Sequence, residues 1–262
     1  MRLLRTPKIQ MAIVLTALSL LQVAFFPTFN LVLKLILILS FTLIIEVVFW
    51  QVRKASPFVP SAAVVTALII FLLAHPLAPL WQPLLACALA VLGKQFVRPG
   101  NHHIFNPAAW GLLIASFVGL PITWWGAIGG NPIYMFILVL GAGFVTFRTI
   151  HQAPIVVTFL LAMIAVASFT SSPATAISQL IIGSILFFTL IMLPEPMTAA
   201  KFPKTKLIYG TLVATLSLAS PAFTPFGIDP LLGALLVGNG VIRFVEAKFP
   251  QLTLRLPNPY IL

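Results

Sequence analysis

The sequence predicts an all-α, polytopic membrane protein of about ten transmembrane segments, with a single integral membrane domain over residues 1–262. Hydrophobic residues make up 60% of the chain and charged residues only 7%, and the mean hydropathy is +1.11. A folded soluble domain could not bury so much apolar surface. The apolar residues also fall into separate stretches of roughly the length at which a helix crosses a bilayer.

Ten apolar stretches follow one another, each roughly 15 to 21 residues long, and several are short for a simple span. The first follows three cations, as in a signal peptide. It runs on through Phe26 without a clear small-x-small cleavage site, which indicates a membrane span. In chain order the predicted segments are 9–26, 30–50, 60–75, 80–97, 106–119, 133–147, 153–170, 176–193, 206–220 and 230–245.

Two of these segments begin with an Asx-Pro pair. Asn106 and Pro107 open the fifth segment, and Asp229 and Pro230 open the tenth. Asn or Asp is a strong N-cap, and proline favours the first helical turn. We therefore expect the fifth helix to present free N–H groups and a partial positive charge at its start.

Two other segments close in Pro-rich sequence, the third over residues 73–79 and the eighth over residues 192–198. In both pairs the two members are offset by five segments, and an odd offset reverses their orientation in the membrane. This predicts an inverted-topology repeat of residues 1–125 and 126–262, with the functional site at its pseudo-twofold interface.

The basic residues support the same topology. With a cytoplasmic N-terminus and ten spans, only Lys34 of the 15 basic residues lies outside, as the positive-inside rule requires. Both termini are then cytoplasmic, in an integral inner (cytoplasmic) membrane protein. The predicted cytoplasmic cations are Arg2, Arg5, Lys8, Arg53, Lys54, Lys94, Arg98, Arg148, Lys201, Lys204, Lys206, Arg243, Lys248 and Arg255.

Topology thus explains the formal charge of +11. A nucleic-acid interface is disfavoured because the cations are dispersed over several cytoplasmic segments instead of forming one stripe. The lone Cys87 excludes an intrachain disulfide, and we expect it to pack as a small apolar residue. No connection between segments is long enough for a nucleotide-binding fold, so any soluble catalytic partner is expected to be a separate chain.

Polar residues gather in an apolar context between Lys94 and Ile114, at the entry to the fifth segment. Such an interrupted helix entry among membrane helices is a place where membrane proteins build sites. Glu195 lies in the eighth closure, where an acid is costly unless it is paired or used. Two interpretations stay open for each polar residue: Asn106 is a simple helix cap or a ligand-binding residue, and Glu195 is a functional acid or a loop carboxylate paired with Lys201 or Lys204.

Other polar and aromatic residues have structural interpretations. Glu46 is expected to balance the charges of Arg53 and Lys54 at the membrane boundary. The histidines are interpreted as solvated side chains and not as haem ligands. Trp124 and Trp125 are expected in an outer interfacial belt. No metal site and no catalytic residue are predicted.

Several of these stretches resemble, in order and at plausible spacing, motifs of the NqrB/RnfD family. That family comprises the ten-helix membrane subunits of sodium-pumping NADH:quinone reductase and of the Rnf ferredoxin:NAD oxidoreductase. The similar stretches are residues 61–68 (SAAVVTAL) with Pro76, 93–95 (GKQ), 103–109 (HIFNPAA), 192–198 (MLPEPMT) and 235–239 (LLVGN).

The resemblance implies flavin-mediated electron transfer within the membrane, with the Asn-Pro start and the acidic-Pro closure in the flavin environment. Two departures matter. The family's Ser-Gly-Ala-Thr-like motif, whose threonine takes FMN through a phosphoester, is missing from residues 120–130, where Thr123 lacks its context. Glu195 stands where the family typically has Asp. We therefore expect a non-covalent flavin, riboflavin or FMN, and sodium pumping is not carried over.

Physically, a flavin ring needs a flat apolar slot and a few hydrogen-bond donors. Helix-start N–H groups could supply donors, as could several of the side chains below, and two aromatic rings could supply a ring face. The predicted cofactor-binding residues are Lys94, His103, Phe105, Asn106, Trp110, Glu195 and Thr198.

The leading hypothesis is a flavin-binding electron-transfer subunit, not a complete enzyme. It would work in the lipid bilayer with soluble or membrane redox subunits of the ferredoxin- or flavin-reductase type. A small-solute channel or transporter built on the same inverted repeat is the alternative. A scaffold that has lost its redox centre is the third.

Overall fold

The computed structural model describes residues 6–53, 60–98, 103–127, 131–169, 172, 183–219, 223 and 226–249. The described residues form ten helical segments, each overlapping one predicted segment. They are α1 (Pro7–Phe25), α2 (Phe29–Val52), α3 (Ser61–Leu73), α4 (Trp81–Phe96), α5 (Pro107–Ser116), α6 (Pro132–Phe136) continued by the π-helical η2 (Ile137–Ala142) and η3 (Val145–Thr149), α7 (Ala153–Ala167), α9 (Gly183–Phe187) continued by the π-helical η4 (Phe188–Met192), α10 (Pro203–Leu218) and α11 (Pro230–Lys248).

The lengths and composition of these helices fit a polytopic helical membrane protein. Among the described residues four helical runs are long and apolar enough to cross a membrane, namely α1, α2, the run over residues 132–149 and α11. Four shorter apolar runs, α3, α5, α7 and the run over residues 183–192, add to them. The predicted all-α membrane fold is therefore confirmed, whereas the number of crossings stays a prediction.

Capping residues set several helix starts as the sequence predicts. The Asn106 side chain accepts a hydrogen bond from the Ala109 backbone N–H at 3.1 Å, and the Asp229 side chain accepts one from the Leu232 N–H at 3.0 Å. Each cap satisfies one of the helix's unpaired N–H groups, and the following proline needs no partner. The predicted N-cap role of Asn106 is thus confirmed, and Asp229 caps α11 in the same way.

Helix α3 is only 13 residues long and ends against an irregular segment of the same chain. The carbonyl oxygen of Leu73 accepts a hydrogen bond from the Thr123 N–H at 3.0 Å, and that of Leu72 accepts one from the Gly126 N–H at 2.8 Å. Irregular backbone at membrane depth is tolerated only where protein covers it. Residues 121–127 supply this cover and replace the missing helical turn.

The two tryptophans of this segment correct a sequence expectation. Trp124, which we expected in an outer interfacial belt, is only 6% exposed, and its indole N–H donates to the Asp229 carboxylate at 2.8 Å. The Trp125 indole N–H donates to the Phe71 carbonyl oxygen at 3.0 Å. The side chains therefore close the end of α3 and brace the start of α11, because an indole N–H that is removed from water needs an acceptor.

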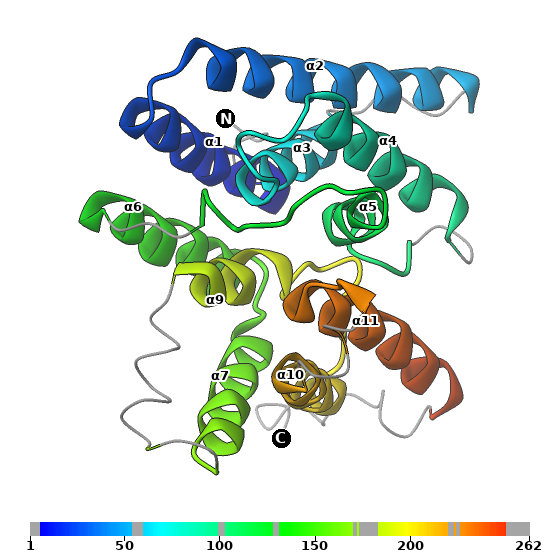
Figure 1. The fold of residues 1–262 in the computed structure, drawn as a ribbon. Helices are drawn as coiled ribbons and strands as arrows, with labels where there is room; N and C mark the ends of the chain where they lie inside the picture. The colour runs from blue at the N-terminus through cyan, green and yellow to red at the C-terminus, as the bar shows by residue number, and fades with distance from the viewer. Residues whose placement is uncertain are drawn as a thin grey trace.

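The two halves of the chain lie side by side, α1–α5 in one group and α6–α11 in the other (Figure 1). Across the boundary α1 packs against η2 and η3, and α5 packs against α11. These contacts join the first span to the sixth and the fifth to the tenth, the pairs that a five-span offset makes equivalent. The arrangement is the one expected at a pseudo-twofold interface, and the inverted repeat itself stays a prediction.

Glycines permit the closest helix contacts within each half. A Cβ atom added at Gly111 of α5 would lie 2.1 Å from the Ala86 carbonyl oxygen of α4, and one added at Gly210 of α10 would lie 2.1 Å from the Thr158 hydroxyl oxygen of α7. Small residues at such contacts let helices pack tightly without a hydrophobic driving force from water. These contacts hold α5 and α10, which carry residues of the site described below.

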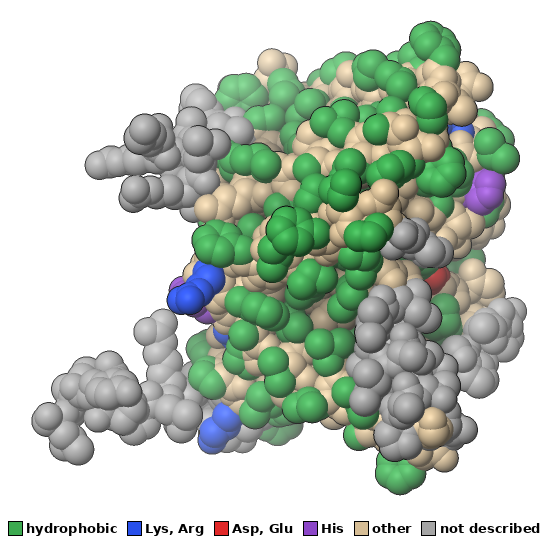
Figure 2. Space-filling view, turned by 90° about the vertical axis from the view of Figure 1, so that its left-hand side faces the viewer, with side chains coloured by type: hydrophobic (Ala, Val, Ile, Leu, Met, Phe, Trp, Pro, Cys, Tyr) green, Lys and Arg blue, Asp and Glu red, His purple; other side chains and the backbone are tan. Residues whose placement is uncertain are grey.

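Lys and Arg side chains gather along the left edge of the face shown in Figure 2, and the apolar belt between the two edges is almost free of them. This distribution agrees with the charge pattern of the sequence. Arg2, Arg5, Lys54 and Arg255, whose side the charge pattern also predicts, lie outside the described residues. The orientation in the cell, including the cytoplasmic termini, stays a prediction.

Thiol labelling tests the orientation. Lys204 and Leu77 are both exposed, and the ten-span topology places Lys204 inside and Leu77 outside. We expect Leu77→Cys to react with a membrane-impermeant maleimide in intact cells and Lys204→Cys to react only after lysis, because the reagent does not cross the bilayer. Cys87 is buried, so its background is low. Labelling of Lys204→Cys but not Leu77→Cys in intact cells would reverse the orientation.

Candidate functional site

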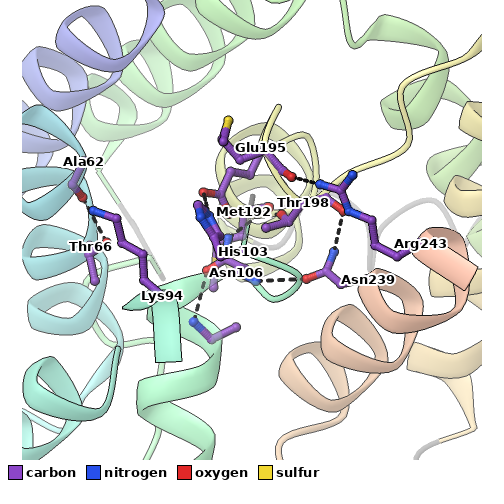
Figure 3. Close-up of polar contacts among 12 residues, drawn as sticks. Ala62, Thr66, Lys94, His103, Asn106, Met192, Glu195, Thr198, Asn239 and Arg243 are labelled. Carbon is purple, nitrogen blue, oxygen red and sulfur yellow. Dashed lines mark hydrogen bonds and ion pairs between the residues drawn. The ribbon is translucent and has the colours of Figure 1, made fainter. Parts of the chain in front are cut away.

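A largely apolar cavity lies where α1 and α3 face the start of α5 and the end of η4. Four of the seven predicted site residues line it: Lys94, His103, Asn106 and Glu195. The walls include apolar side chains of α3, of η4 and of the loop that follows it, with Lys8 and Thr66 as further polar members. Figure 3 shows the Lys94 side chain on one side and His103, Asn106 and Glu195 grouped on the other.

Asn106 holds the start of α5 through three hydrogen bonds. Besides the cap to Ala109, its side-chain amide donates to the Met192 carbonyl oxygen at 3.4 Å, and its backbone N–H donates to the Asn239 side-chain oxygen at 3.0 Å. Asn106 is only 3% exposed, so each of these buried polar groups needs its partner. The Asn106 side-chain amide, which we expected to donate to a ligand, thus already donates one hydrogen bond to the last carbonyl oxygen of η4.

His103 and Glu195 meet at the cavity although 92 residues separate them in sequence. The His103 Nε2 atom lies 3.4 Å from a Glu195 carboxylate oxygen, and the Thr198 hydroxyl donates to the other oxygen at 3.1 Å. The expectation of a solvated His103 is wrong, because the residue is only 8% exposed and its ring contacts the Glu195 carboxylate. Glu195 also does not pair with Lys201 or Lys204 in the described contacts, since it faces the cavity.

Lys94, in the last turn of α4, forms an ion pair with Glu46 of α2. The Glu46 side chain is 4% exposed and that of Lys94 is 20% exposed. Arg53, one predicted partner of Glu46, donates instead to the Gln95 carbonyl oxygen, and Lys54 lies outside the described residues. The second carboxylate oxygen of Glu46 is buried without a hydrogen-bond partner, so its charge depends on Lys94.

The two predicted aromatic residues stack on each other and do not line the cavity. The ring centroids of Phe105 and Trp110 lie 5.1 Å apart with an interplanar angle of 12°. A Cβ atom added at Gly93 would lie 2.4 Å from the Trp110 ring, so α4 presses against the indole. One face of each ring is therefore taken by the other ring, and neither residue lines the cavity.

Three polar residues behind the cavity, Asn239, Arg243 and Tyr209, were not among the predicted site residues, although Asn239 ends the family-like stretch at residues 235–239. Asn239 and Tyr209 are fully buried. The Asn239 amide donates to the Tyr209 hydroxyl at 2.7 Å, and the Arg243 guanidinium donates to the Met197 carbonyl oxygen. A signal existed, because Asn239 and Arg243 lie four residues apart on an apolar helix, which places them on one face.

The cavity presents hydrogen-bond donors at the edge of an apolar space. Lys94 and His103 can donate to acceptor atoms of a ligand, and Glu195 can accept or hold a proton. No cluster of three or more His, Cys, Asp or Glu side chains suited to a metal ion occurs among the described residues. Chemically, the site suits a largely apolar, acceptor-rich organic molecule.

Comparisons with known proteins give two kinds of relative. The chain is 23% identical to the NqrB subunit of the Na(+)-translocating NADH-quinone reductase of Yersinia pestis, over 74% of this chain and 60% of that protein. It is 34% identical to the RnfD-type subunit of the ion-translocating oxidoreductase complex of Haemophilus ducreyi, over 39% of this chain and 31% of that protein. The NqrB protein of Klebsiella pneumoniae is 21% identical over the same shares as that of Yersinia pestis.

No family model matches the chain. The chain spans about 60% of the length of the quinone reductase proteins that it matches. The two kinds of relative are nevertheless those that the motifs at residues 103–109 and 192–198 indicate, and the same residues form the cavity and its surroundings. The sequence matches to these two kinds of subunit support a relationship of the chain to the NqrB/RnfD family, and its polytopic helical membrane fold fits that relationship.

Proposed function

We propose that this chain is a flavin-binding, membrane-embedded electron-transfer subunit of an NqrB/RnfD-like redox complex. It would pass electrons between a cytoplasmic redox partner and an acceptor in or across the membrane. The observation that carries the proposal is the cavity that gathers Lys94, His103, Asn106 and Glu195 from separate parts of the chain. The redox names of the two kinds of relative support it.

The residues around the cavity fit a flavin. A flavin ring is flat and largely apolar with nitrogen and oxygen acceptors on its edge, so it needs apolar walls and a few donors. Val65, Ile69 and Ile191 supply apolar wall, and Lys94 and His103 supply donors. The stacked pair Phe105–Trp110 would then support the start of α5 from behind instead of contacting the ring.

Each polar residue has a role that follows from its surroundings. A bound flavin would supply reversible electron transfer. Lys94 would place positive charge beside the ligand, while Glu46 balances that charge in the free protein. His103 and Glu195 form a hydrogen-bonded pair that can hold a proton at Nε2 or at the carboxylate. The apolar walls exclude water and so strengthen these interactions.

The short connections between the helices bear on the partners of the proposed subunit. The described residues are helical segments with short connections, and none of these connections could hold a nucleotide-binding domain. Soluble or membrane redox subunits of the ferredoxin- or flavin-reductase type would therefore deliver or take up the electrons. The exposed cations Lys8, Arg148 and Lys204 give the proposed cytoplasmic side a charge that attracts acidic partners.

Visible absorption of the purified protein tests the proposal. We expect flavin bands from the protein in detergent at about one flavin per chain, and we expect the flavin to leave the polypeptide on denaturation. The reason for the second expectation is that residues 120–130 lack the phosphoester motif. Gel fluorescence after denaturation measures retention. A fluorescent band abolished by Thr123→Ala would contradict the non-covalent prediction.

The outcome also separates the three hypotheses about function. Protein purified without flavin, and unable to take up riboflavin or FMN, would overturn the proposal. Flux of a small solute through reconstituted vesicles would then favour the transporter hypothesis. A folded chain with neither property would favour a scaffold.

A further inference from the structure

Asn239 ties together the two interrupted segments that line the cavity. Its side-chain oxygen accepts the hydrogen bond of the Asn106 backbone N–H at 3.0 Å, and its amide group donates to the Thr198 carbonyl oxygen at 3.4 Å. Figure 3 shows it between the start of α5 and the loop after η4, on the side of α11 that faces both. One side chain thus connects residues that the sequence separates by more than 90 positions.

The orientation of this amide is fixed by a third partner. The Asn239 amide also donates to the Tyr209 hydroxyl at 2.7 Å. Both residues are fully buried, and a buried amide keeps its orientation when every polar atom has a partner. Tyr209, on α10, therefore holds the side-chain oxygen of Asn239 toward Asn106.

The same face of α11 also fixes the loop that carries Glu195. Arg243, one turn after Asn239, donates to the Met197 carbonyl oxygen. The neighbouring Thr198 donates its hydroxyl to the Glu195 carboxylate at 3.1 Å and its backbone N–H to the Glu195 carbonyl oxygen at 3.2 Å. Holding residues 197–198 therefore also sets the direction of the Glu195 carboxylate.

We propose that Asn239 is a positioning residue for the cavity, which sets the start of α5 against the Glu195 loop without touching the ligand. Asn239 does not line the cavity, whereas Asn106 and Glu195 do. The inference rests on the proposed function, because the ligand whose binding it governs is the flavin. Its structural part, that Asn239 holds the Asn106 N–H, does not depend on the ligand.

The test compares Asn239→Leu with a matched control in the full chain. Leucine has nearly the shape of asparagine and removes all three side-chain hydrogen bonds. Gln22→Leu is the control, because Gln22 is also a buried amide that donates to a distant carbonyl, that of Gly126 at 3.1 Å, and it does not line the cavity. A purely structural role predicts that both variants lower the unfolding temperature and keep their flavin.

A positioning role predicts a different pattern. We expect Asn239→Leu to retain flavin about tenfold less well than the wild type and to shift the midpoint potential of what remains, while Gln22→Leu keeps both. Tyr209→Phe keeps the ring and removes the hydroxyl, so its flavin retention should lie between those of Asn239→Leu and Gln22→Leu. Hydrogen exchange of the peptide over residues 103–110 should accelerate in Asn239→Leu and not in Gln22→Leu, with or without flavin.

Failure of the inference and failure of the proposed function are distinguishable. Wild-type protein without flavin would overturn the proposed function, and the exchange of residues 103–110 would still decide whether Asn239 holds Asn106. Wild-type protein with flavin and an Asn239→Leu variant with the same flavin content and potential would overturn the inference alone. Unchanged exchange at residues 103–110 would do so as well. If Asn239→Leu does not fold, Tyr209→Phe with unchanged flavin content, potential and exchange overturns it.

Discussion

Asn106→Leu is expected to lose its flavin and much of its stability, because leucine removes both roles of the side chain. The cap to Ala109 is worth about 0.5–2 kcal/mol, and the buried Met192 carbonyl oxygen would lose its side-chain donor at about 1–3 kcal/mol. Unfolding in mixed micelles and flavin content per chain measure the two losses. This variant should show the largest combined effect.

Asn106→Asp separates the two roles. Aspartate caps as well as asparagine, so the Ala109 contact should survive and the protein should insert and purify. A carboxylate cannot donate to the Met192 carbonyl oxygen, and its negative charge opposes the charge that reduction brings to a flavin. We therefore expect lower flavin content or a lower midpoint potential with only moderate loss of stability.

Asn131 provides the control for both variants. It also caps a helix that begins with proline, and its side chain accepts from the Ile133 N–H at 2.8 Å, but it does not line the cavity. Asn131→Leu should lower stability only by the loss of the cap, and Asn131→Asp should change stability little. Both variants should keep their flavin. If Asn106→Asp keeps stoichiometric flavin at an unchanged midpoint potential, Asn106 is a cap alone and the site must be sought around Glu195 and Thr198.

The sequence predicts the helical segments because their signals are local. Apolar stretch length places the helices, and an Asx-Pro pair specifies a helix start through chemistry within four residues, as at Asn106 and Asp229. The ends of α3 and η4 were also marked, by proline. The hydrogen-bond donors for the last carbonyl oxygens of these helices could not be predicted. The Leu73 carbonyl is paired with Thr123 and the Met192 carbonyl with Asn106, and both donors are distant in the sequence.

The same difference between local signals and distant contacts explains why only part of the site was predicted. Asn106 and Glu195 stood out as polar residues beside proline in apolar sequence, and both line the cavity. Their partners depend on helix packing, which brings His103 to Glu195 and Asn239 to Asn106 across the chain. Trp124 illustrates the limit, because an indole suits the membrane interface and a buried carboxylate contact equally well.

Lys94→Met is expected to destabilise the protein by about 3–5 kcal/mol, because it leaves the buried Glu46 carboxylate without a countercharge. Glu46→Leu should cost less, since the Lys94 ammonium is partly exposed at the cavity and keeps its place near the C-terminal end of α4. The double variant Lys94→Met/Glu46→Leu should return close to wild-type stability, because a packed apolar pair replaces a buried ion pair at little cost.

Flavin content distinguishes a ligand-binding lysine from one that only balances Glu46. If Lys94 donates to the flavin, Lys94→Met and the stable double variant should both lose the flavin. Glu46→Leu should keep the flavin and raise the flavin midpoint potential, since the lysine charge is no longer balanced. Arg53→Met is the control, because it removes one cation near the same end of α2 from an exposed position. A double variant that is stable and fully loaded with flavin would leave Lys94 with a structural role only, and His103 would then be the donor to test next.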